Sequence, residues 1–260
     1  PDYPYRSGIT ETLSRNLKST GKIIVEKYKI TKQSFIVDIG SNDGTLLSGF
    51  KDVGMKVMGV EPTNIAKIAN KDNIPTIQSF FDENVANKIV NDNQKAKVVT
   101  AANMFAHVSQ LDSLIKGVEI LLEENGFFVT ESHYVLDLLE TLQYDSIYHE
   151  HLKYYSLHSI LKLFDYYNFT VIDVERIKNY GGSIRVFAQK GKNHEVRDNI
   201  KKMLKLEKSY GLNKGKVFKT FAERVRSSKF NLNKLLYDII SKKKTIVGIG
   251  SPGRASTLLN

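Results

Sequence analysis

A glycine-containing loop at residues 38–44 carries two carboxylates directly after a short apolar run. Its sequence is Asp38-Ile39-Gly40-Ser41-Asn42-Asp43-Gly44. The glycines let the backbone approach a ligand and adopt dihedral angles that a side chain would forbid. Glu61 follows the next apolar run, about 20 residues later, where an acid can accept hydrogen bonds from the two hydroxyls of a ribose. These residues predict a site for an adenosine-containing cofactor.

Both a nicotinamide dinucleotide and S-adenosylmethionine present a ribose to such an acid. A dinucleotide site uses the spacing Gly-x-Gly-x-x-Gly, which lets a pyrophosphate reach the N-terminus of a helix. The loop at 38–44 lacks that spacing, and its carboxylates would repel a pyrophosphate while suiting a sulfonium and an α-amino group. We therefore expect S-adenosylmethionine, which becomes S-adenosylhomocysteine on methyl transfer. The segment 248–253 does fit the dinucleotide spacing, but the sequence ends before the position of the matching acid.

The densest group of proton-transfer side chains is Tyr148-His149-Glu150-His151. The pKa of histidine suits general acid–base catalysis near neutral pH. His107 follows another apolar run and is expected at the same sheet edge as the loop at 38–44. Two other roles remain open from the residues alone: the histidines cap a following helix, or they bind buried carbonyl groups. A metal ion at His149 and His151 would need further ligands, none of which stands at a recognisable spacing, so we expect no metal.

Short apolar runs alternate with amphipathic segments along the first half of the chain. The runs typical of strands are 35–39, 56–61, 76–78, 97–102 and 126–131, and helical patterns cover 8–29, the residues from Thr45, 64–70 and 111–123. This alternation predicts a doubly wound, mostly parallel α/β sheet with helices on both faces. A helix at 155–167 and a pair of strands at 170–174 and 183–188, joined across Gly181-Gly182, are expected to follow.

The pattern predicts three parts of the chain. Residues 1–30 form a leading helix, and residues 31–192 form the domain that binds S-adenosylmethionine. Residues 193–260 form a long charged helical linker that ends in a predicted strand at 245–250, expected to begin a second α/β unit. A single strand cannot bury itself alone, so we expect the sequence to be part of a longer protein.

Composition narrows the class of protein. The 260 residues carry a net charge of +10. The sequence has no cysteine, and this absence excludes disulfides, thiolate catalysis and zinc sites that need sulfur. No apolar run approaches the roughly 20 residues of a membrane span, and the N-terminus is too polar for a signal peptide, so we expect a cytoplasmic enzyme without a membrane partner. Lysines gather at 190–218 with few aromatic residues between them, unlike a surface that stacks bases, so nucleic acid is not the expected partner.

The loop at 38–44 resembles the first motif of class I methyltransferases. A longer series of motifs resembles the sugar C-methyltransferases that modify nucleotide-linked ketodeoxysugars. The series occurs in the order Tyr3-Pro4-Tyr5-Arg6-Ser7-Gly8, the loop at 38–44, Asn103-Met104-Phe105-Ala106-His107, Tyr148-His149-Glu150-His151, Gly181-Gly182-Ser183-Ile184-Arg185 and Gly250-Ser251-Pro252-Gly253-Arg254-Ala255-Ser256-Thr257-Leu258-Leu259-Asn260. The resemblance covers nearly the whole chain. It does not include the family's N-terminal zinc-binding module or most of its C-terminal domain.

The resemblance implies roles for individual residues. Phe80 is expected beside the adenine, and Asn103 near the methionine portion of the cofactor. His151 is the expected base that removes a proton next to the ketone, Tyr148 and His107 its partners at the enolate or as acids, and Glu150 the group that orients an imidazole. The expected contacts to the nucleotide-diphosphate sugar are Tyr5, Arg185 and Arg254.

Two other functions remain open. Another class I methyltransferase, acting on oxygen, nitrogen or RNA, would keep the loop at 38–44 and Glu61 but would have no need of the histidine-rich segment. A non-catalytic fragment that binds S-adenosylmethionine or a sugar nucleotide would need no base.

Overall fold

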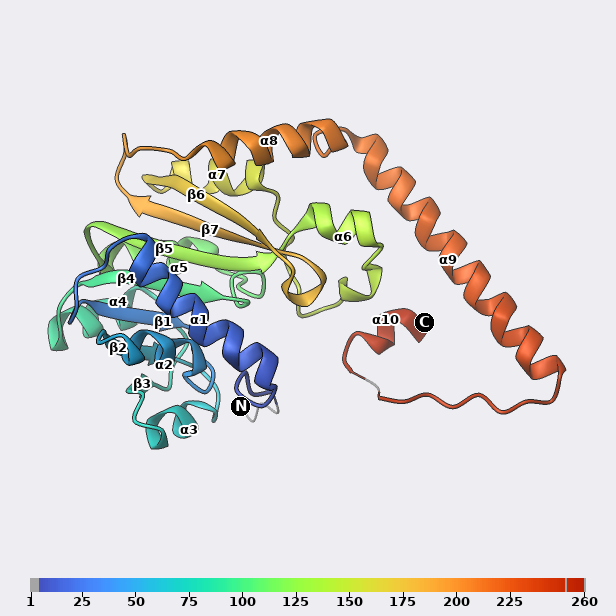
Figure 1. The fold of residues 1–260 in the computed structure, drawn as a ribbon, viewed down its shortest axis with the longest axis horizontal. Helices are drawn as coiled ribbons and strands as arrows, with labels where there is room; N and C mark the ends of the chain where they lie inside the picture. Colours follow the sequence, from blue (N-terminus) through green and yellow to red (C-terminus); the bar gives the residue numbers. More distant parts are fainter. Residues whose placement is uncertain (1–4, 251, 260) are drawn as a thin grey trace.

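The computed structural model describes residues 5–250 and 252–259 of the chain, so Tyr3, Pro4, Ser251 and Asn260 of the motifs lie outside the described residues. A seven-stranded sheet with the order β3-β2-β1-β4-β5-β7-β6 forms its centre (Figure 1). The strands are β1 (Phe35–Ile39), β2 (Lys56–Val60), β3 (Thr76–Ile77), β4 (Ala96–Ala102), β5 (Leu122–His133), β6 (Phe169–Ile177) and β7 (Ser183–Lys190).

The strand order reverses between β1 and β4. Strands β1 to β5 are parallel, and β7 is antiparallel to both of its neighbours. The chain runs outward from β1 to β3 and then crosses over to β4, so the connections on the two sides diverge at the carboxyl end of β1. Ligands bind at such a switch point in open α/β sheets. The predicted doubly wound, mostly parallel sheet is confirmed.

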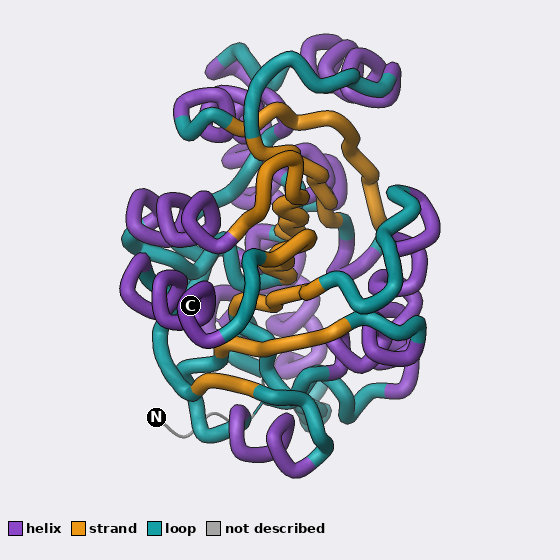
Figure 2. The backbone as a smooth tube through the Cα atoms, turned by 90° about the vertical axis from the view of Figure 1, so that its left-hand side faces the viewer, coloured by secondary structure: helices purple, strands orange, loops and turns teal. Residues whose placement is uncertain are grey.

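Helices cover both faces of the sheet (Figure 2). They are α1 (Glu11–Lys27), α2 (Thr45–Asp52), α3 (Ala66–Lys71), α4 (Glu83–Asp92), α5 (Leu111–Leu121), α6 (Val135–Thr141), α7 (Leu157–Tyr166), α8 (Asp198–Tyr210), α9 (Gly215–Ser241) and α10 (Ala255–Leu259), with short 3₁₀ turns η1 (Tyr144–Ser146) and η2 (Asn179–Gly181). Successive side chains of β1 point to opposite faces of the sheet. Ile36 packs with α1 and α2, whereas Val37 and Ile39 pack with α4 and α5.

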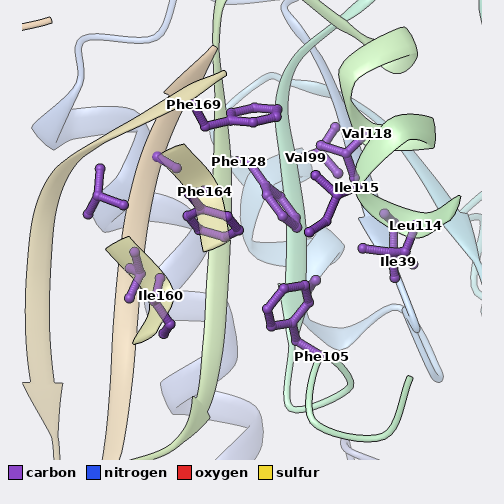
Figure 3. Packing of buried hydrophobic residues seen from close by; sticks show 14 of the residues in the cluster. Ile39, Val99, Phe105, Leu114, Ile115, Val118, Phe128, Ile160, Phe164 and Phe169 are labelled. Carbon is purple, nitrogen blue, oxygen red and sulfur yellow. The ribbon is translucent and has the colours of Figure 1, made fainter. Parts of the chain in front are cut away.

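A chain of aromatic rings anchors the loop after β4. Phe105 lies in that loop, with its ring centroid 6.0 Å from that of Phe128 on β5 (Figure 3). Phe128 lies 5.5 Å from Phe164 on α7, which lies 6.1 Å from Phe169 on β6. All four side chains are buried, and each large aromatic ring removes much apolar surface from water. The loop that carries Asn103 and His107 is therefore fixed to the core.

The N-terminus of α7 is satisfied without the histidines. Ser156 is the N-cap and accepts from the backbone of Ser159, and the buried carboxylate of Glu207 on α8 accepts from the backbone N–H groups of Leu157 and His158. These bonds satisfy the free N–H groups of the first turn. The histidines of segment 148–151 therefore do not cap α7, which was one of the roles left open by the sequence.

Residues 245–250 form no strand, contrary to the expectation. They follow α9 as extended chain that is exposed throughout, with Ile249 98% exposed. An apolar run becomes a strand only where a neighbour accepts its hydrogen bonds, and no described strand lies beside this run. α4 and α6 are helices that the apolar pattern did not predict. The expected division at residues 30 and 192 stays a prediction.

The C-terminal part leaves the sheet with α9, and its last helix returns to η1. None of the residues of α9 is buried, and the guanidinium of Arg224 ties the helix to the carbonyls of Leu139 and Glu140. α10 comes back beside η1, where the Thr257 hydroxyl donates to the carbonyl of Ile147 at 3.4 Å (Figure 1). Among the described helices, none is both long and apolar enough to cross a membrane.

A glycine at the contact between α1 and α2 tests the packing that holds α1 over the sheet. A Cβ at Gly49 would overlap the backbone of Lys18, whereas a Cβ at Gly215 on α9 would meet no atom within 4 Å. We expect Gly49→Ala to lower the free energy of unfolding by about 1–3 kcal/mol, because overpacking must separate two helices. Gly215→Ala is the matched control and should cost nothing. Denaturant unfolding that shows equal stability for both variants would contradict this packing.

Candidate active site

A pocket of about 580 Å³ opens at the carboxyl ends of β1, β2 and β4. It brings together seven of the eight residues expected to bind the cofactor: Asp38, Gly40, Ser41, Asn42, Glu61, Phe80 and Asn103. Tyr5 and His107 also line it. Gly44 does not: it has φ 78° before α2, and a Cβ there would lie 2.9 Å from the side chain of Ile74. Gly44 therefore serves the turn rather than the pocket wall.

Glu61 is buried with its carboxylate held at the pocket. Its Oε2 accepts from the backbone N–H of Asn42 and its Oε1 from that of Thr63, both at 2.9 Å. Each carboxylate oxygen keeps a further lone pair, so the group can still accept from two hydroxyls. This arrangement fits the ribose of an adenosine.

The backbone of the loop passes close to the opposite wall. Gly40 has φ 72°, and a Cβ there would lie 2.9 Å from the side chain of Met104. Asn42 and Asn103 also have positive φ, at 52° and 58°. Asparagine tolerates this region better than most residues. The Met104 side chain can thus pack against the loop only because Gly40 has no side chain.

The two acids of the loop have different environments. Asp38 is buried in the pocket wall, where Thr100 donates to it at 2.6 Å. Burial raises the pKa of Asp38 to about 7, the charge of Glu61 adds to the rise, and the Thr100 hydrogen bond opposes it. Asp43 lies outside the pocket and accepts from Thr45 and from the backbone of Gly8 at 2.8 Å. Of the two acids, therefore, it is Asp38 that lines the pocket.

Residues 5–8 lie over the loop. The backbone N–H of Ser7 donates to the Asn42 side chain at 2.9 Å, and the amide of Asn42 donates to the Tyr5 carbonyl at 3.1 Å. Together with the Gly8–Asp43 bond, these contacts fix the segment that precedes α1. They explain how Tyr5, 33 residues before Asp38 in the sequence, comes to line the same pocket.

The imidazole of His151 lies among other rings. Its centroid is 4.9 Å from that of His107, 4.8 Å from that of His133 and 4.7 Å from that of Tyr148. Its Nδ1 lies 2.7 Å from the carbonyl oxygen of Ser146. A carbonyl can only accept, so Nδ1 carries the proton and Nε2 keeps its lone pair in the neutral ring. His151 is therefore set up as a base.

The segment 148–153 is tied to the loop after β4. The backbone N–H of Leu152 donates to the Ala106 carbonyl at 3.1 Å, and the main-chain carbonyl of Glu150 accepts from the ring of His107. The Glu150 carboxylate accepts from the Tyr148 hydroxyl at 2.9 Å. Glu150 thus acts on the ring of His107 through both its carboxylate charge and its backbone. Desolvation and the neighbouring His151 lower the pKa of His107, against the pull of Glu150.

His133 and Tyr180 belong to the site but were not predicted. His133 ends β5, and burial, followed by the charges of His151 and Arg254, lowers its pKa to about 4. Tyr180 in η2 lines the pocket. His133 could have been found by the rule that selected His107, because it also stands at the end of a strand. Tyr180 carries no such signal.

The two arginines expected at the sugar nucleotide lie elsewhere. Arg185 is buried on β7, where its guanidinium binds Glu131 at 2.8 Å and Glu175 at 3.3 Å. With its hydrogen-bonding groups taken up inside the fold, it does not reach the pocket, and we drop it as a substrate contact. Arg254 is partly exposed and pairs with Asp145 at 3.7 Å, beside the histidine-rich segment but outside the pocket lining. Within the described parts of the chain, no group of His, Asp or Glu is arranged to hold a metal ion.

Comparison with known families agrees with this geometry. Residues 6–174 match the family described as a methyltransferase domain, and residues 178–260 match the C-methyltransferase C-terminal domain. The chain belongs to the methyltransferase family. Its resemblance to C-methyltransferases is confirmed.

One curated relative covers almost the whole chain. C-methyltransferase NovU of Streptomyces niveus is 32% identical over 259 residues, which are 99% of this chain and 62% of that protein. The chain thus spans less than two thirds of the relative's length.

Solved structures show the same fold at low identity. Magnesium protoporphyrin IX methyltransferase of Synechocystis PCC 6803, with bound SAH, has a TM-score of 0.53 and 12% identity, covering 68% of this chain and 83% of that one. PH0226 of Pyrococcus horikoshii OT3 has a TM-score of 0.55 and 16% identity, covering 72% of this chain and 94% of that one. These two structures show that the chain has the class I methyltransferase fold.

Cofactor binding should depend on the charge of Asp38. With a pKa of about 7, its carboxyl is largely neutral at pH 6 and largely ionised at pH 7.5, and a cation binds the ionised form. We expect S-adenosylmethionine to bind roughly eightfold more weakly at pH 6 than at pH 7.5 in calorimetry. Asp38→Asn, which cannot ionise, is the control and should bind weakly at both. An equal pH dependence in both proteins would contradict the assignment to Asp38.

Proposed function

We propose that this methyltransferase uses S-adenosylmethionine to methylate the carbon next to the ketone of a nucleotide-diphosphate-linked ketodeoxysugar. The observation that carries the proposal is His151, a histidine with its Nδ1 proton bound to the Ser146 carbonyl, packed against a residue that lines the cofactor pocket. A methyltransferase that acts on a nucleophilic oxygen or nitrogen has less need of a cluster of imidazoles beside its cofactor.

The residues of the pocket fit S-adenosylmethionine. Glu61 would hold the ribose, Asp38 would face the positive charge of the methionine portion, and Gly40 lets Met104 pack closely against the loop that lines the pocket. Phe80, with its ring largely exposed in the pocket, is assigned to the adenine, and Asn103 to the methionine end. Similarity to a C-methyltransferase, and a fold shared with a methyltransferase that holds SAH, support this assignment.

Carbon becomes nucleophilic when it is next to a carbonyl and loses a proton. We assign Nε2 of His151 to take that proton, which leaves the electron pair of the C–H bond on an enolate. Bound S-adenosylmethionine supplies the electrophilic methyl group, to which the enolate carbon bonds while the pair of the carbon–sulfur bond stays with sulfur. Holding the two reactants in contact contributes much of the rate enhancement of such a step.

Neighbouring groups complete the proposed chemistry. We assign Tyr148 and His107, both next to His151, to the enolate oxygen as hydrogen-bond or acid partners. Methylation restores the ketone, and the proton that His151 has taken then passes to solvent. His107 can donate to the enolate only when it is protonated, because its neutral ring is already bound to the Glu150 carbonyl. Tyr5 and Arg254 are assigned to the sugar nucleotide, with Arg254 suited to a diphosphate once it leaves Asp145.

Replacing the proposed base tests this function. We expect His151→Asn to lower methyl transfer to a thymidine-diphosphate-linked 4-keto-6-deoxyhexose by about a hundredfold or more, because general base catalysis is worth that much. Exchange of the α-proton with deuterated water, followed by NMR, should fall equally. Affinity for S-adenosylmethionine should not change.

His149→Asn is the matched control, because His149 is exposed and adjacent in sequence. It should keep near-parent rates of exchange and transfer. If His151→Asn exchanges the α-proton as fast as the parent, His151 is not the base.

A further inference from the structure

Tyr180 is the aromatic residue of η2, the turn between β6 and β7, and it lines the pocket together with Tyr5. Its backbone is left-handed, with φ 52° and ψ 28°. A bulky residue other than glycine adopts this conformation only when its surroundings hold it there. Two glycines with positive φ follow it, at residues 181 and 182.

Bonds from three other elements hold the turn. The Asn179 side chain donates to Glu131 at 3.2 Å and to Asn16 at 2.9 Å, and the Gln143 side chain donates to the Gly181 carbonyl at 2.7 Å. Glu131 is itself buried and paired with Arg185. The strained conformation of Tyr180 is therefore fixed by β5, α1 and the end of α6 rather than left to a free loop.

The sheet topology places Tyr180 at the end of the pocket away from the ribose acid. β7 is antiparallel to β5, with Ser183 opposite His133, so the turn before β7 lies at the edge where the parallel strands end. Glu61 follows β2, and β2 and β7 are separated by three strands in the sheet order. Four strand spacings amount to about 19 Å. The ring of Tyr180 instead neighbours His133, at 6.2 Å between centroids.

The hydroxyl of Tyr180 can act as a donor. It lies 3.3 Å from the hydroxyl of Tyr5. Either phenol can be the donor of this bond, and when Tyr5 donates, the proton of Tyr180 is available to a ligand. Burial and the neighbouring Tyr5 hydroxyl raise the pKa of Tyr180, so its phenol stays protonated at neutral pH. A phenol of this kind suits a carbonyl or hydroxyl oxygen rather than a cation.

We propose that Tyr180 is an acceptor-binding residue whose phenol donates a hydrogen bond to an oxygen of the ketosugar ring. The proposal rests on the proposed function, since it takes the histidine end of the pocket to be the place of the sugar. It adds a contact on the side of the acceptor opposite Glu61, presented by a turn that the fold holds rigid. The hydroxyls of Tyr5 and Tyr180, which lie 3.3 Å apart, then favour a sugar that has an oxygen within hydrogen-bonding distance of the pair.

Tyr180→Phe tests the proposal by removing only the hydroxyl. Calorimetry with the thymidine-diphosphate-linked 4-keto-6-deoxyhexose, in the presence of S-adenosylhomocysteine, should show about tenfold weaker binding, as expected for the loss of one hydrogen bond. The KM for the sugar should rise by a similar factor with little change in kcat. Affinity for S-adenosylmethionine and the thermal midpoint should stay as in the parent.

Tyr237→Phe is the matched control, because Tyr237 is 73% exposed on α9. Unchanged sugar binding in Tyr180→Phe would overturn the proposal, and so would an equal loss of affinity for S-adenosylmethionine, which would place Tyr180 at the cofactor. If the parent binds the sugar but neither exchanges its α-proton nor methylates it, the proposed function fails, while the difference in sugar affinity still decides the role of Tyr180.

Discussion

The buried carboxylate of Glu131 connects the two halves of the candidate site. It pairs with Arg185 on the neighbouring strand β7, and the two residues are also register partners in the sheet. Its side chain accepts from Asn179 in η2, while its main-chain carbonyl accepts from the backbone N–H of Asn103 at 2.8 Å. Removing one partner of a buried ion pair costs about 3–5 kcal/mol, so the register between β5 and β7 is strongly fixed. The loop after β4, which carries Asn103 and His107, and the turn that carries Tyr180 therefore keep one relative position.

The pocket is lined by groups of different chemical character. Asp38 and Glu61 line it with carboxylates, and His107, Tyr5 and Tyr180 line it with an imidazole and two phenols. His151 adjoins His107, and His133 adjoins His151, both outside the lining residues. Burial favours the neutral form of a group in both places, raising the pKa of Asp38 and lowering that of His133. A bound cation would restore the charge of Asp38, whereas the neutral rings offer bases and donors to an uncharged ketone. This division suits a positively charged methyl donor and a carbonyl acceptor.

Local sequence patterns predicted the sheet and most of the residues at its edge, because an apolar run and the loop that follows it can be recognised within a few consecutive residues. The apolar run of β1 and the loop after it are one example, and His107 after β4 is another. α4 escaped prediction because few apolar residues, Ala86 and Ile89 among them, interrupt a polar segment that begins at the N-cap Asp82. The run at 245–250 was predicted as a strand because its own residues suit one, but pairing depends on a neighbour elsewhere in the chain.

The role of Arg185 could not be predicted for a related reason. Its partner Glu131 lies 54 residues earlier in the sequence, and only the antiparallel pairing of β5 with β7 brings the two together. Because Arg185 lies within a conspicuous motif, the sequence suggested that it contacts a ligand. In the structure it forms an internal ion pair with Glu131 instead. Tyr180 shows the reverse case, because its place at the pocket comes from the turn geometry and not from its neighbours in sequence.

The atom that receives the methyl group is the most direct test of the function. The protein can be supplied with S-adenosylmethionine labelled with ¹³C in its methyl group and with a nucleotide-linked 4-keto-6-deoxyhexose labelled with ¹³C in the ring. Methylation of the carbon next to the ketone predicts a one-bond ¹³C–¹³C coupling between the new methyl group and the ring in the NMR spectrum of the product. A labelled methyl group without that coupling, bonded instead to oxygen or nitrogen, would contradict carbon methylation by this protein.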